Sequence, residues 1–120
     1  MILVDTSVWV EHFRRGHPPL VRLLERGDAA MHPMILGELA CGQLPKRAST
    51  LQLLQSLPQI AEAPSEAVLH ALEARRWVGA GIGWVDAHLL TSAILSHTPL
   101  WTLDRRLDKI ARAAQAAHET

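Results

Sequence analysis

The first residues of the chain place the tightest constraint on its fold. Met1–Val4 is an unbroken apolar run, which is typical of a short strand buried on both faces of a parallel sheet. Asp5 follows the run directly, and Thr6 or Ser7 can cap a helix that begins there. Because open α/β sheets bind ligands outside the carboxyl ends of their strands, Asp5 stands where a functional group is expected. The alternative is that Asp5 only helps to cap the helix.

The rest of the chain alternates between strand and helix signals. Short strands are predicted at residues 28–32 and 99–103, and residues 59–63 are an extended segment that can pair with the sheet. Helices are predicted at residues 6–15, 18–27, 34–42, 46–57, 65–78, 84–97 and 104–116. This alternation indicates an α/β fold with right-handed crossovers, in which about four short, mostly parallel strands are flanked by roughly six or seven helices. Residues 116–120 have no strand character, so a fifth strand is not expected there.

Composition narrows the class of protein. A chain of 120 residues is long enough for one compact domain, so residues 1–120 are expected to form a single unit. The 12 basic and 12 acidic residues cancel, so attraction to nucleic acid must come from local patches. Cys41 is the single cysteine, which excludes an intrachain disulfide. No apolar run approaches the roughly 20 residues of a membrane span, and the N-terminus lacks a basic signal region. We therefore expect a soluble, cytoplasmic protein without a membrane partner.

Four acidic residues stand at positions where a plain surface role is not expected. Asp104 closes the 99–103 strand as Asp5 closes the first, so parallel pairing would bring both to one edge, with the strands about 4.8 Å apart. Glu38 and Asp86 fall at helical spacings from apolar residues of their own helices, which predicts that both lie on apolar faces. Acids on a buried face are costly unless something pairs with them.

A divalent cation would relieve the repulsion among these four carboxylates. Two like charges about 4 Å apart repel by roughly 4 kcal/mol at an effective dielectric near 20, and a domain is stable by only about 5–15 kcal/mol. All-oxygen ligands select hard ions, Mg²⁺ or Mn²⁺, over Zn²⁺. The sequence has no HExxH or CxxC motif, and its 7 histidines are scattered. We interpret His88 as a structural residue and Cys41 as a small core residue.

Four segments carry these acids together with their neighbours: Val4–Trp9, Gly37–Leu39, Gly83–Leu90 and Trp101–Asp104. In residue type, order and spacing they resemble the PIN-domain ribonucleases, and in particular the VapC-type toxins of bacterial type II toxin–antitoxin pairs. The likeness covers nearly the whole chain as a single PIN domain. It implies that Asp5, Glu38, Asp86 and Asp104 form a catalytic site that binds Mg²⁺, or alternatively Mn²⁺. It also implies that Thr6 and Thr102 support this site.

The resemblance further implies an activity and partners. The activity would be metal-dependent hydrolysis of RNA phosphodiester bonds by the toxin of a toxin–antitoxin pair. The implied partners are RNA, a cognate antitoxin protein and a second copy of the chain in a homodimer. The apolar residues Leu20, Leu23 and Leu24 could form a groove for the antitoxin, but a role in the core is the preferred interpretation.

A negatively charged site must still hold a polyanion, so basic and aromatic residues near it are of interest. The pair Arg105–Arg106 is the best candidate for phosphate contacts, since it follows Asp104 directly. Trp84, beside a glycine-rich loop, is a candidate for base stacking, whereas the other tryptophans are expected to pack in the core.

Two other readings compete with the ribonuclease. A PIN-like module that is catalytically silent would bind RNA or a protein without cleaving it, but such a module has no reason to keep four mutually repelling acids. A metal phosphohydrolase for small substrates would instead hydrolyse a generic phosphomonoester.

Overall fold

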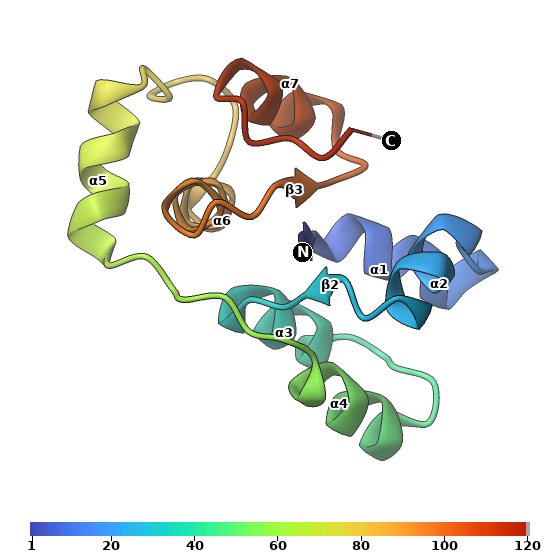
Figure 1. The fold of residues 1–120 in the computed structure, drawn as a ribbon. Helices are drawn as coiled ribbons and strands as arrows, with labels where there is room; N and C mark the ends of the chain where they lie inside the picture. The colour runs from blue at the N-terminus through green and yellow to red at the C-terminus, as the bar shows by residue number, and fades with distance from the viewer. Residues whose placement is uncertain (120) are drawn as a thin grey trace.

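The protein is described by a computed structural model that covers residues 1–119. Its centre is a sheet of three parallel strands in the order β2-β1-β3 (Figure 1). The strands are β1 (Ile2–Val4), β2 (Ala29–Ala30) and β3 (Leu100–Trp101). Ile2 pairs with Ala29 on one side of β1, and Val4 pairs with Trp101 on the other. The first apolar run is therefore the central strand.

Seven helices lie around this sheet within residues 1–119 (Figure 1). They are α1 (Thr6–Arg15), α2 (Pro18–Glu25), α3 (Pro33–Cys41), α4 (Arg47–Ser56), α5 (Ser65–Ala74), α6 (Trp84–Leu95) and α7 (Arg105–Ala113). α6 packs beside β3, and α5 packs on α6. The predicted α/β fold with a parallel sheet and six or seven helices is confirmed.

Helix starts follow from single residues. Pro18 and Pro33 open α2 and α3 at the first position, where proline loses no hydrogen bond. Asp5 caps α1, because its side chain accepts a hydrogen bond from the Ser7 N–H at 3.4 Å. The expectation that Thr6 or Ser7 provides this cap is wrong, since both lie inside the first helical turn. Asp5 therefore does cap this helix, as the alternative interpretation of Asp5 predicted.

The strand count differs slightly from the expected four. Residues 59–63 contribute only one parallel bridge, between Gln59 and Met31, so this segment is not a strand. Pro58 and Pro64 bound it and keep it short. At the opposite edge, Ala117 forms a single parallel bridge with Leu100. Position 120 of the C-terminal segment lies outside the described residues. Both outer strands are therefore covered at one point by an irregular segment, which limits exposed sheet edges.

The core joins the sheet to α6. Leu3 and Val4 of β1 are fully buried, as are Leu89 and Leu90 of α6. Other members of the core are those predicted to pack there: Leu20, Leu23, Trp9, Trp77 and Trp101. Within residues 1–119, no helix combines the length and the apolarity that crossing a membrane requires. α6 is buried over Ala87–Ala93, so its first turn, which carries Asp86, lies at the edge of the core.

Candidate active site

Asp5 lies at the carboxyl end of β1 and is only 7% exposed. Its Oδ2 atom accepts hydrogen bonds from the hydroxyls of Ser7 at 2.7 Å and Thr102 at 2.8 Å, in addition to the Ser7 N–H. Its Oδ1 atom accepts no hydrogen bond from the described residues. One oxygen is therefore fixed in place, while the other remains open to a ligand.

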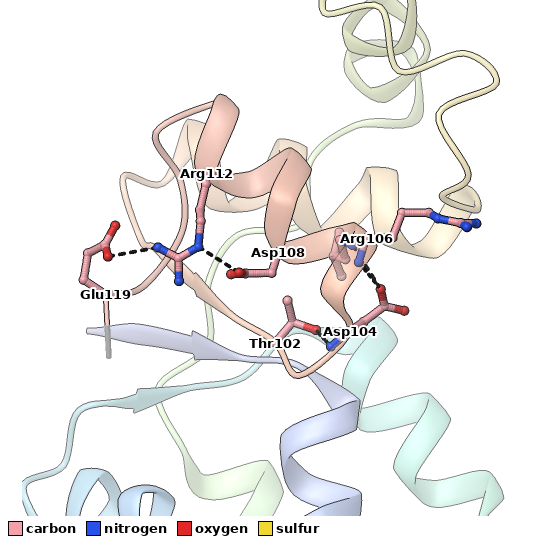
Figure 2. Close-up of polar contacts among 7 residues, drawn as sticks. Thr102, Asp104, Arg106, Asp108, Arg112 and Glu119 are labelled. Carbon is pink, nitrogen blue, oxygen red and sulfur yellow. Dashed lines mark hydrogen bonds and ion pairs between the residues drawn. The ribbon is translucent and has the colours of Figure 1, made fainter.

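The hydroxyls of Ser7 and Thr102 join the ends of two strands. Ser7 Oγ accepts a hydrogen bond from the Leu103 N–H at 3.0 Å, and Thr102 Oγ1 accepts one from the Asp104 N–H at 3.0 Å. Each hydroxyl thus donates to Asp5 and accepts from the segment that follows β3. Figure 2 shows the contact between Thr102 and Asp104. Ser7 was predicted only as a helix cap, and its contact with the Leu103 N–H was not predicted. The available signal was a hydroxyl two residues after a strand-end aspartate.

Asp104 begins α7 beside the same edge of the sheet. Its Oδ1 atom accepts hydrogen bonds from the N–H groups of Arg106 at 2.9 Å and Leu107 at 3.0 Å (Figure 2). Its Oδ2 atom accepts no hydrogen bond from the described part of the chain. Asp104 is therefore a helix cap that presents one open carboxylate oxygen, as Asp5 does.

Glu38 reaches the site from α3. Its Oε1 atom accepts a hydrogen bond from the Thr6 hydroxyl at 2.7 Å. The prediction that Glu38 lies on a buried face is wrong, because its side chain is exposed. Three residues span about 300° of a helix, so Glu38 is offset by roughly 60° from Ile35 and lies at the border of the apolar stripe. That border position places it at the rim of the site.

Asp86 is half-buried in the first turn of α6. Burial raises its pKa above the ordinary value, and the Gly83 backbone acts in the opposite direction. The negative charges of Asp5, Asp104 and Glu38 raise the pKa of Asp86 further. The four acids predicted from distant parts of the sequence are thus within electrostatic range of one another.

The four carboxylates are not neutralised by ion pairs within residues 1–119. Within residues 1–119, no three carboxylate, imidazole or thiol groups are close enough to bind one ion together as the side chains stand. The donor set nevertheless fits a hard divalent ion, since it consists of carboxylates, three of which keep one oxygen open. Binding would require side chains to move toward the ion.

Arg106 lies against the loop that leads into α6. Its Nη1 atom donates a hydrogen bond to the Gly81 carbonyl at 3.5 Å. Gly81 has a φ of +88°, and a Cβ added there would lie 2.5 Å from Arg106 Cδ. Only glycine therefore allows the guanidinium of Arg106 to lie on this loop. Arg105, beside it, is exposed.

The residues that carry the site fall within a known family of domains. The family model described as "PIN domain" matches residues 2–113. This chain belongs to the PIN-domain family. Two relatives are the proteins named Ribonuclease VapC32 from Mycobacterium tuberculosis, strains CDC 1551 / Oshkosh and ATCC 25618 / H37Rv. Each is 45% identical to this PIN domain over 108 residues, which cover 89% of this chain and 87% of the relative.

A solved structure supports the fold of this PIN domain. The crystal structure of PAE2754 from Pyrobaculum aerophilum matches it with a TM-score of 0.68 and 19% identity. The match covers 98% of this chain and 87% of that one. The family resemblance read from four short segments is therefore confirmed over nearly the whole chain.

Trp84 and His88 lie together on the first turns of α6 in this PIN domain. Trp84 is 42% exposed, and its ring meets the His88 ring edge-on with centroids 4.9 Å apart. His88 is buried, and its Nδ1 atom has no hydrogen-bond partner among the described residues. The exposed tryptophan is the one that the sequence singled out for base stacking.

Asp108 forms a 2.7 Å ion pair with Arg112, which also pairs with Glu119 at 2.9 Å (Figure 2). Asp108 thus holds the C-terminal segment rather than the acidic site. Cys41 is exposed at the end of α3, so its interpretation as a core residue is wrong.

A buried histidine connects the two helices that carry Glu38 and Asp86. His32 is fully buried, and its Nδ1 atom accepts a hydrogen bond from the Met34 N–H at 3.0 Å, which caps α3. Its Nε2 atom lies 3.0 Å from the Ser92 hydroxyl on α6. Burial lowers the pKa of His32, the charge of Glu62 raises it, and His88 lowers it. This link was not predicted, because no local sequence pattern indicates that His32 and Ser92 meet.

Proposed function

We propose that this PIN domain is a metal-dependent endoribonuclease and the toxin of a toxin–antitoxin pair. The observation that carries the proposal is the gathering of four uncompensated carboxylates, in which the charges of the other three act on Asp86. The name of the M. tuberculosis relatives, Ribonuclease VapC32, supports RNA as the substrate class.

The acidic residues of the site would bind a cation, and the neighbouring arginines would bind RNA. Asp5 and Asp86 would be the most direct ligands of Mg²⁺ or Mn²⁺, and Glu38 and Asp104 would complete the set or orient the attacking water. When bound, such an ion supplies Lewis acidity toward water and the phosphodiester. Thr6 would keep Glu38 in place through the hydroxyl bond that it already makes.

Thr102 would act in the same way on Asp5. Its hydroxyl fixes Oδ2 and leaves Oδ1 as the oxygen that would be free to bind an ion. Because Thr102 also accepts the Asp104 N–H, it sets the relative position of two ligands at once. Thr102 is thus proposed as a positioning residue.

Arg105 and Arg106 are proposed to contact the RNA backbone. Arg106 is held on the Gly81 loop, between the start of α7, where Asp104 lies, and the start of α6, where Asp86 lies. Positive charge at this place would attract phosphate without reading the sequence of the RNA.

The VapC-type resemblance extends the proposal to partners. We expect a cognate antitoxin protein, a homodimer and a cytoplasmic location. Of the three leucines considered for an antitoxin groove, Leu20 and Leu23 are buried in the core and Leu24 is half-buried against it, so an antitoxin would have to bind mainly through other residues. The organisation of residues 1–120 as a single domain also stays a prediction.

The decisive experiment is RNA cleavage by the purified chain with Mg²⁺, with Mn²⁺ and with EDTA. Asp5→Asn and Asp86→Asn should each lower the rate by about 100-fold or more, as expected when a charge at the reacting centre is removed. Asp108→Asn is the matched control, because it removes an acid that pairs with Arg112 instead. Cleavage that EDTA and Asp5→Asn leave unchanged would contradict the metal mechanism.

One observation favours a second candidate, a catalytically silent module that binds RNA or protein. In the described chain no three of the acids are close enough to bind one ion together. This candidate predicts that RNA binds but stays intact with either metal. It also predicts that Mg²⁺ has no effect on the melting temperature, because no specific ion site would exist.

A further inference from the structure

A cavity of about 410 Å³ opens beside Glu38. It lies between α1, α3 and the loop that connects α3 to α4, and we name it the side pocket. The residues that line it include Thr6, Phe13, Arg14, Glu38, Gln43 and Leu44. Its volume falls within the range of about 300–1,000 Å³ that is usual for small-molecule sites.

The side pocket shares a wall with the candidate active site. Thr6 and Glu38 line the pocket, and the hydrogen bond between them at 2.7 Å forms the boundary. A molecule bound at the four acids would therefore extend directly to the side pocket. The pocket is too near the acids to be an independent site.

The lining of the side pocket combines apolar and polar parts. Phe13 and Leu44 are half-buried and offer apolar surface, and Phe13 is itself stacked on Trp9 with ring centroids 6.0 Å apart and planes at 26°. Arg14 and Gln43 are exposed and provide a cation and an amide. A nucleobase has matching features, namely flat apolar faces and a hydrogen-bonding edge, and it is joined to phosphates.

We propose that the side pocket receives the base of a nucleotide that adjoins the phosphodiester held at the four acids. Phe13 stacks on this base, Gln43 reads its edge and Arg14 contacts a flanking phosphate. The inference rests on the proposed function, because it takes RNA as the occupant of the acidic site. It adds a place where the enzyme distinguishes one base from another.

The test measures binding of short single-stranded RNA oligonucleotides that carry either a base or an abasic ribose at successive positions. All variants are made in an Asp104→Asn background, so that the RNA stays intact while fluorescence anisotropy is recorded with Mg²⁺ present. Loss of the base at one position should weaken binding by about tenfold, the scale of a lost base–aromatic stack. Phe13→Leu keeps an apolar side chain without a ring, so it should remove most of that difference.

Two exposed residues provide tests that do not depend on core packing. Gln43→Ala should change the order of preference among the four bases and leave binding of the abasic RNA unchanged. Arg14→Gln should weaken binding of base-bearing and abasic RNA equally. Arg15→Gln is its matched control at the same helix end, since Arg15 pairs with Glu11 at 3.6 Å and does not line the pocket; it should have no effect.

The outcomes separate the inference from the proposed function. Equal binding of base-bearing and abasic RNA would overturn the pocket, and so would a base dependence that survives both Phe13→Leu and Gln43→Ala. In either case RNA cleavage by the parent would still support the ribonuclease. If the parent cleaves no RNA yet shows the predicted base dependence, the pocket stands and the ribonuclease fails. A side pocket that a protein segment fills, with RNA excluded, would also overturn the inference.

Discussion

The candidate site has two halves that are held in place differently. The strand half comprises Asp5 and Asp104, whose positions are fixed by the hydroxyls of Ser7 and Thr102 and by helix-start N–H groups. The helix half comprises Glu38, which accepts one side-chain hydrogen bond, and Asp86, which depends on the burial of α6. The strand half is therefore preorganised by local hydrogen bonds, whereas the helix half is placed by packing and is freer to move toward a ligand.

Thr102→Val should have the largest effect, because it breaks the strand half. The substitution leaves the Asp104 N–H without its acceptor and removes a donor from Asp5. Loss of such a buried group costs about 1–3 kcal/mol, and RNA cleavage should fall because the ligands lose their positions. Urea unfolding and cleavage rates measure the two effects.

The control for this prediction is Thr98→Val. Thr98 is also buried near β3, but its hydroxyl donates only to the Ser96 carbonyl at 3.3 Å. Its replacement should lower stability less and leave cleavage unchanged. Equal losses of cleavage in both variants would mean that Thr102 contributes nothing particular to the site.

Gly81→Ala tests the contact between the two halves, where Arg106 of α7 meets the loop before α6. A positive φ costs a residue with a Cβ roughly 1–2 kcal/mol, and at Gly81 the new Cβ would also displace the Arg106 side chain. Gly79→Ala is a matched control, because Gly79 has a φ of +70° but nothing within 4 Å of its added Cβ. Both variants should lose stability, and only Gly81→Ala should weaken RNA binding. Equal RNA affinities would show that the position of Arg106 does not matter.

His32 gives the helix half a dependence on pH. Because the folded pKa of His32 lies below its ordinary value of 6.5, the unfolded chain binds the proton more tightly. The contribution of His32 to the free energy of unfolding is therefore fully present above pH 6.5, and it is lost as the pH falls through the lowered folded pKa. Protonation removes the acceptor of the Met34 N–H, so the loss should approach the value of a helix cap, about 1 kcal/mol.

Urea unfolding of the parent and of His32→Asn across this range measures the effect. Asn can accept the same N–H without titrating, so the variant should lose the acid-dependent part of the change. The exposed His70 supplies the control variant His70→Asn, which should follow the parent. A parent curve and a His32→Asn curve with the same slope would contradict the assignment.

The two halves also differ in how well the sequence predicts them. Asp5 and Asp104 follow apolar runs, and the rule that parallel strands end at one edge was sufficient to bring them together. Helical spacing selected Glu38 and Asp86, but it misplaced Glu38 on a buried face because a period cannot distinguish the centre of a stripe from its border. Contacts between distant elements, such as His32 with Ser92, depend on packing that no local pattern encodes.

The smallest effect is expected from Asp86→Asn in the absence of metal. Burial and three neighbouring acids raise the folded pKa of Asp86 above its ordinary 3.8, so the folded chain binds this proton more tightly than the unfolded chain does. The parent therefore loses stability as the pH rises from below 3.8 through the raised folded pKa. At neutral pH the charged Asp86 carboxylate lowers the stability of the folded protein. Removing the charge should stabilise the metal-free protein at neutral pH by a few tenths to about 1 kcal/mol, as expected for a partly solvated charge. The gain should vanish in acid, where the Asp86 carboxyl of the parent is also neutral.

Mg²⁺ should raise the melting temperature of the parent more than that of Asp86→Asn, since a ligand stabilises the folded state that binds it. A loss of stability in metal-free Asp86→Asn would instead assign Asp86 to a structural hydrogen bond and leave the helix half without its proposed ligand.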